Sequence, residues 1–91
     1  MVNNLPKEMT YTKANYLELL MEHVDGLTPS DVSDIYFDDV SLHAANNALR
    51  RLKKGGLAVR RLDRQLDGSE FRYWITDRGI RRYDYLRSKE K

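Results

Sequence analysis

The amino-acid sequence predicts one α+β domain with the element order helix, helix, helix, strand, strand, helix. Two observations support this fold class. Apolar residues recur at helical spacing in three stretches before residue 55 and again after residue 76. Between these stretches, residues 57–66 and 69–76 flank Asp67-Gly68, which favours a hairpin of two strands. With 91 residues, the chain is long enough for one hydrophobic core but not for two domains.

The composition limits the class of protein further. With 41% hydrophobic residues, 33% charged residues and a net charge of +2, the chain is expected to fold. The longest run without Asp, Glu, Lys or Arg is the ten-residue segment Val40–Leu49, so no membrane span is expected. Because the chain has no cysteine and Met1–Met9 is polar, we expect no disulfide, no thiolate zinc site, no export and a cytoplasmic location.

The first helix is expected over residues 12–24, after an N-terminal arm of residues 1–10. Its apolar positions have the spacing i, i+3, i+4 and i+7 and are Leu17, Leu20, Met21 and Val24, with Tyr16 beside them. Thr10 or Thr12 can cap this helix, and Asp25-Gly26 ends it.

Two further helices follow. Thr28-Pro29-Ser30-Asp31 predicts a helix start, because a hydroxyl caps the first turn and proline takes the first helical position. This helix should run to about Tyr36 and bury Val32 and Ile35. After a turn at residues 37–39, Ser41 is placed to cap a third helix that ends before Gly55-Gly56. At 100° per residue, its core-facing positions fall within about 80° and are Leu42, Ala45, Leu49 and Leu52.

The register of the hairpin depends on the length of its loop. A two-residue turn at Asp67-Gly68 would place the apolar residues on opposite faces. A three-residue loop at 66–68 instead pairs Val59 with Ile75 and Arg61 with Tyr73, and it is the register we expect. Arg64 then faces Glu70, and Arg60 can stack on Trp74. Trp74 is expected either under another element or exposed beside Leu62.

The last helix is expected from Asp77 to about Ser88, with Thr76 as its cap. Ile80, Tyr83 and Leu86 follow helical spacing on its core side. The folded domain then covers residues 11–88 and leaves a short tail of residues 89–91.

Charge is distributed unequally along the chain. Residues 1–40 hold two basic and eight acidic side chains, a formal charge of −6, whereas residues 41–91 hold fourteen basic and six acidic ones, a charge of +8. The outward side of the third helix carries His43, Asn47, Arg50, Arg51 and Lys54, with no carboxylate between Val40 and Arg61. Such a side suits a polyanion, whereas a solvated helix usually mixes both signs.

Three motifs in this order resemble the winged helix-turn-helix transcription regulators of the MarR, ArsR and PadR type. They are Gly26-Leu27-Thr28-Pro29-Ser30-Asp31, Leu49-Arg50-Arg51-Leu52-Lys53-Lys54-Gly55-Gly56-Leu57 and Tyr73-Trp74-Ile75-Thr76-Asp77-Arg78-Gly79. The resemblance implies that helix 41–54 enters the major groove, while hairpin 57–76 is a wing that reaches a neighbouring phosphate or the minor groove. It does not extend to the long additional helices with which larger members dimerise and bind effectors.

The sequence therefore predicts a double-stranded DNA-binding protein, a transcriptional regulator that acts as a homodimer. Asn47 can contact adenine and His43 a base edge, whereas the cations more often meet phosphates. Ser30, at the start of the second helix, can donate to a phosphate, and the alternative is that this helix start serves only for capping by the neighbouring Thr28. The candidate DNA-binding residues are Ser30, Ser41, His43, Asn47, Arg50, Arg51, Lys54, Arg64 and Gln65.

The sequence also indicates a dimer surface and an alternative function. The dimer is expected through the first and last helices, because Tyr11, Tyr16 and Tyr85 suit an interface. The alternative function is a winged-helix protein interaction module whose acidic helices bind a partner without DNA contact. We expect no enzyme, cofactor or metal, since His23 and His43 lack ligand spacing and the chain has no glycine-rich phosphate loop.

Overall fold

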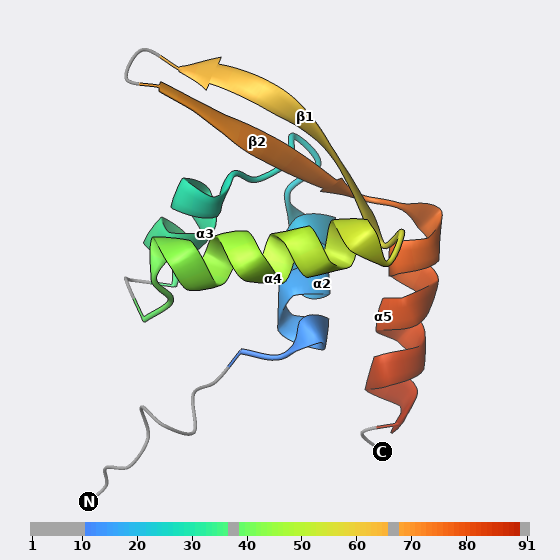
Figure 1. Ribbon diagram of the computed structural model, residues 1–91. Coiled ribbons are helices and arrows are strands. Elements are labelled where there is room, and N and C mark those ends of the chain that lie inside the picture. The colour runs from blue at the N-terminus through green and yellow to red at the C-terminus, as the bar shows by residue number, and fades with distance from the viewer. Residues whose placement is uncertain (1–10, 37–38, 66–67, 90–91) are drawn as a thin grey trace, which may run out of the picture.

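The computed structural model describes residues 11–36, 39–65 and 68–89 and has an α+β fold. Within these ranges four helices and one antiparallel hairpin follow in the expected order (Figure 1). The elements are α2 (Lys13–Glu22), α3 (Pro29–Ile35), α4 (Leu42–Lys54), β1 (Ala58–Gln65), β2 (Gly68–Ile75) and α5 (Asp77–Lys89). The expected N-terminal arm and the turn residues 37–38 lie outside the described ranges, and α5 extends one residue into the expected tail.

Local hydrogen bonds start each helix where the sequence predicted. Thr28 Oγ1 accepts from the Asp31 amide at 3.1 Å, and the Asp31 carboxylate accepts from the Thr28 amide at 3.0 Å, which completes a capping box. Ser41 Oγ accepts from the Ala44 amide at 3.0 Å. The caps at Thr12 and Thr76 are formed in the same way. These four helix starts are therefore confirmed.

The core lies where α2, α3, α4 and the base of the hairpin meet (Figure 1). The side chains that no solvent reaches are Leu17, Val32, Ala45, Leu49 and Tyr73. Two expected core positions are wrong: Val24 is 82% exposed and Leu42 is 54% exposed. α2 ends at Glu22, so Val24 leaves the helical periodicity, and Leu42 is the first residue of α4, beyond the edge of the core.

The hairpin adopts neither of the two registers considered from the sequence. Val59 pairs with Trp74 and Arg60 with Tyr73, so the predicted pairs of Val59 with Ile75 and of Arg61 with Tyr73 are wrong. The two residues between the strands, 66–67, lie outside the described ranges. This register places Tyr73 and Ala58 on the face that the core buries.

Two predicted contacts in the hairpin are replaced by others. Glu70 does not pair with Arg64, because its carboxylate accepts from both the amide and the hydroxyl of Ser30 in α3, at 3.2 and 2.6 Å. The guanidinium of Arg60 lies 3.8 Å over the Phe71 ring rather than on Trp74. Contacts with the helices, which local pairing rules do not include, thus set the register.

Trp74 is half-buried under the loop that follows α2. Gly26 in that loop has φ +85°, and a Cβ on it would lie 2.7 Å from the indole ring. Leu62 is 47% exposed and pairs with Phe71, so it lies on the other face of the hairpin. The first alternative for Trp74, cover by another element, is therefore confirmed.

α5 packs on α2 through one side. Ile80, Tyr83 and Leu86 are half-buried there, as their spacing predicted. At its first turn, Gly79 is buried so closely against the Leu57 carbonyl that a Cβ would overlap this oxygen. Of the helices in the described part of the chain, none has the length and apolar content to cross a membrane.

Candidate nucleic-acid interface

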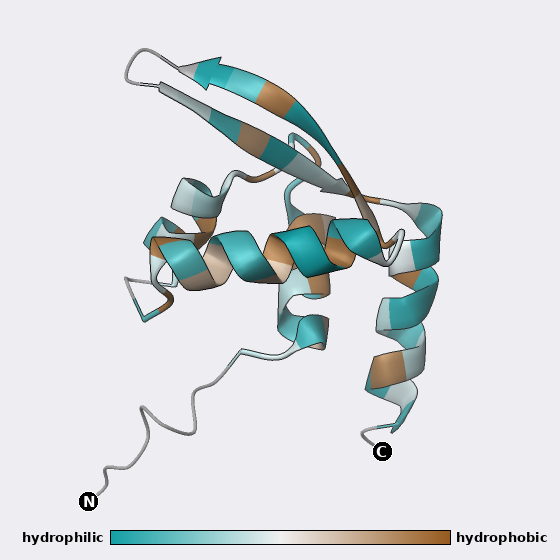
Figure 2. Cartoon of the chain, in the orientation of Figure 1, coloured by the Kyte–Doolittle hydropathy of each residue, from teal (hydrophilic) through white to brown (hydrophobic). Residues whose placement is uncertain are grey.

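The outward side of α4 is the most basic part of this helix. The buried residues of α4 are Ala45, Leu49 and Leu52, so their side of the helix faces the core and the opposite side points outward. Figure 2 shows that the side of α4 turned to the viewer is largely hydrophilic. The helix ends at Gly55, and Gly56 with φ +79° turns the chain into β1. This turn brings the first residues of β1 beside the last turn of α4.

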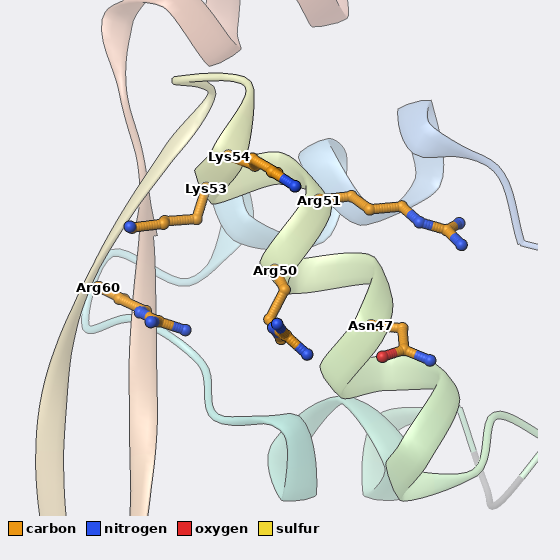
Figure 3. A pocket seen from close by; sticks show the side chains of 6 residues that line it. All are labelled: Asn47, Arg50, Arg51, Lys53, Lys54 and Arg60. Carbon is orange, nitrogen blue, oxygen red and sulfur yellow. The ribbon is translucent and has the colours of Figure 1, made fainter.

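An open hollow of about 440 Å³ lies between α4 and β1. We call it the basic hollow. Its lining residues are Asn47, Arg50, Arg51, Lys53, Lys54 and Arg60. In Figure 3, Lys53 and Arg60 project toward the space between helix and hairpin, whereas Arg51 points away from the hairpin. Five cations and one amide therefore line one open hollow, but in Figure 3 only some of their side chains are directed toward the hairpin.

No carboxylate of the described residues forms an ion pair with a cation of the basic hollow. The ion pairs within residues 11–36, 39–65 and 68–89 join Arg72 to Asp31 and to Asp63, and none includes a cation of the hollow. The cations that line the basic hollow repel one another, so an anion bound in the hollow reduces their electrostatic repulsion. The geometry is suited to a phosphate-rich ligand.

Arg60 is held in place by two aromatic side chains. Its Nη1 donates to the hydroxyl of the buried Tyr73 at 3.1 Å, and its guanidinium stacks on Phe71. Neither Arg60 nor Lys53 was among the predicted site residues. Lys53 lies on the flank of α4, and Arg60 joins the hollow only in the observed register. The signal that places Arg60 in the hollow is its pairing with Tyr73 across the hairpin, and the expected register did not contain this pair.

Asn47 and His43 contact each other on the outward side of α4. The distance between Asn47 Nδ2 and His43 Nε2 is 3.1 Å, so one amide N–H is directed at the imidazole. The Asn47 carbonyl oxygen and the second N–H are not used in this contact. These two groups are the pair that an asparagine needs to contact adenine.

The remaining predicted site residues lie in three other places, at the starts of α3 and α4 and at the end of β1. Ser41 Oγ caps α4, although its own proton can still be donated. The amide and the hydroxyl of Ser30 both donate to the Glu70 carboxylate, so these donors bind a carboxylate of the chain and not a phosphate. Arg64 is exposed on β1 opposite Ser69, far along the strand from the basic hollow. The side chain of Gln65 lies outside the described part of the chain.

Comparisons with known proteins identify no relative of this chain. No protein-family model, curated protein or solved structure matches the chain. Function is therefore inferred from the arrangement of the chain's own side chains.

Proposed function

We propose that this chain is a winged-helix protein that binds double-stranded DNA and regulates transcription. The observation that carries the proposal is the basic hollow, whose lining holds five cations from α4 and β1, none of them in an ion pair within the described residues. In this proposal α4 enters the major groove, which is wide enough for a helix, and the β1–β2 hairpin is the wing. A protein interaction module has no need of such an acid-free surface.

The proposal divides the site into two kinds of contact. The cations of α4, with Arg60, bind phosphates and supply affinity that depends on salt. Asn47 supplies sequence preference through its amide. We therefore expect Arg50→Ala to weaken binding to every sequence alike. Asn47→Ala should cost about 1–3 kcal/mol at the preferred site and much less on random DNA.

Fluorescence anisotropy with a labelled pool of random duplexes tests the proposal. If six phosphates are neutralised, log K should fall with log salt at a slope of about −5. The double variant Arg50→Gln/Arg51→Gln should make this slope less steep by about 2. Its matched control is Lys13→Gln/Arg87→Gln, which removes two exposed cations outside both the basic hollow and the hairpin. Absence of binding at 50 mM salt would contradict the proposal and favour the interaction module.

A homodimer is the second part of the proposal, with a revised surface. Tyr11 stacks on Tyr36 at 3.8 Å between ring centroids, and Tyr16 is 7% exposed, so both rings are used within the chain. At the junction of α2 and α5 lies a mostly apolar hollow of about 320 Å³, beside the exposed Val24. A two-fold axis there would place Val24 of one copy in the hollow of the other.

Sedimentation equilibrium tests this surface. We expect a dimer at micromolar concentration and a mass near 10.7 kDa for Val24→Glu. Leu62→Glu, at an exposed position on the hairpin, is the control and should leave the dimer intact. A mass near 10.7 kDa for the unmodified chain at every concentration would reject the dimer.

A further inference from the structure

α5 carries a second basic surface, separate from the basic hollow. Arg78, Arg82, Tyr85 and Lys89 have the spacing i, i+4, i+7 and i+11, so they share one side of the helix. All four are exposed. At 100° per residue, Asp77 and Asp84 are about 80° and 100° around the helix from Tyr85, and both are about 100° or more from the three cations. We call these four residues the α5 stripe.

Among the described residues, the cations of the α5 stripe have no acidic partner. In the described part of the chain, no carboxylate lies within ion-pair distance of Arg78, Arg82 or Lys89. Arg82 and Lys89 instead flank the ring of Tyr85, at 5.9 and 5.5 Å from its centroid. The ring thus keeps two cations close together on the outer side of α5, which favours an anionic ligand.

The apolar residues of α5 distinguish between two anionic ligands for the stripe, a membrane surface and a polyanion. A helix that lies on a membrane inserts an exposed apolar side below its basic one. In α5, Tyr83 and Leu86 are half-buried against the core, and Ile80 is half-buried beside the hollow at the junction with α2. Tyr85 is the exposed large hydrophobic residue of the helix. The α5 stripe therefore fits a polyanion better than a lipid surface.

The α5 stripe begins where the basic hollow ends. A Cβ placed on Gly56 would lie 3.6 Å from Arg78 Cδ, and Gly56 follows Lys54 of the hollow by two residues. Figure 1 shows α5 starting beside the C-terminal end of α4 and running away from it at a steep angle. At 1.5 Å per residue, the 13 residues of α5 extend about 20 Å, or about six base pairs of B-DNA.

We propose that the α5 stripe binds the phosphate backbone of the duplex beyond the segment that α4 contacts. This inference rests on the proposed function. It adds phosphate contacts that carry no sequence information and lengthens the bound segment by about six base pairs. Affinity should therefore depend on duplex length as well as on sequence.

Anisotropy titrations with duplexes of 10 and 24 base pairs test the α5 stripe. The variant is Arg82→Gln/Lys89→Gln, and the matched control is Lys13→Gln/Arg87→Gln, because Arg87 lies on the other side of α5 from the stripe. On the long duplex, the variant should bind more weakly, with a salt slope less steep by about 2. On the short duplex, it should bind within about two-fold of the unmodified chain. Circular dichroism should give the same melting temperature for both proteins, since both side chains are exposed.

Each outcome assigns success or failure to one proposal. If the unmodified chain binds neither duplex, the proposed function fails. If it binds both and the variant keeps the full salt slope on 24 base pairs, the inference about α5 is overturned while the proposed function stands. Equal losses on both lengths would also overturn it, because the stripe would then contact the segment held by α4. Loss of binding to vesicles with 30% phosphatidylserine, with DNA binding unchanged, would assign the stripe to a membrane instead.

Discussion

Arg72 ties the hairpin to the helical part of the protein. Its Nε and Nη2 each lie 2.7 Å from Asp63 Oδ2 on β1, and its Nη1 donates to the Gly26 carbonyl oxygen at 3.1 Å. The same Nη1 lies 3.6 Å from Asp31 Oδ2 in the first turn of α3. One guanidinium therefore connects both strands, the loop after α2 and the start of α3. We expect Arg72→Ala to destabilise the protein more than any other single loss of an exposed or half-buried charge.

The magnitude follows from these contacts. A hydrogen bond to a charged group contributes about 1.5–3 kcal/mol when buried. The Arg72 side chain is 28% exposed and the two carboxylates are 32% and 41% exposed, so water can replace part of what is lost. We therefore expect a loss of about 2 kcal/mol in total. For a domain of this size, that loss lowers the melting temperature by about 8–16 °C.

Urea denaturation followed by circular dichroism measures this loss. The matched control is Arg61→Ala. Arg61 is the same type of residue and pairs directly with Arg72 across the hairpin, but the two side chains have different neighbours. Arg61 is exposed, and its guanidinium lies 5.6 Å from the Trp74 ring centroid, so its removal should cost less than about 1 kcal/mol. Equal losses for the two variants, or a loss below about 0.5 kcal/mol for Arg72→Ala, would refute the reasoning.

Three further predictions concern the packing of the core and the dependence of the protein's stability on pH. Gly79→Ala should cost about 2 kcal/mol or more in urea denaturation, because the new methyl group overlaps a backbone carbonyl, whereas at Gly55 the nearest atom is 3.6 Å away and alanine should fit. Leu49→Ala should cost about 2–5 kcal/mol by thermal denaturation, against less than about 1 kcal/mol for the exposed Leu42→Ala; equal shifts would contradict the assigned core. Burial raises the pKa of Tyr36 to about 12, so the folded state keeps this proton while unfolded chains lose it. Stability should therefore fall between pH 10 and 12, and Tyr36→Phe should make this fall smaller; an unchanged pH profile would argue against it.

The basic surface of α4 could be predicted because it depends on one helix. Arg50, Arg51 and Lys54 follow from the angular position of Ala45, Leu49 and Leu52, whose spacing identifies the buried side. Arg60 and Lys53 could not be added in the same way. Their place in the basic hollow requires the position of β1 relative to α4, and this position depends on contacts between residues far apart in the chain.

The sequence by itself determined the order of the elements and the start of each helix. Caps at Thr28 and Ser41 depend on hydrogen bonds across three residues, so neighbouring side chains suffice to predict them. The same holds for the apolar spacing of the core-facing residues in α4 and α5.

Only the tertiary structure decided the register of the hairpin and the use of its charged residues. Glu70 and Ser30 are forty positions apart, and Arg72 and Gly26 are forty-six apart, yet these contacts hold β2 against the helical part. A rule based on facing pairs in two isolated strands does not include them, so it placed Glu70 opposite Arg64. The physical reason is that a hairpin of two strands is barely stable alone and takes its register from the surface that it covers.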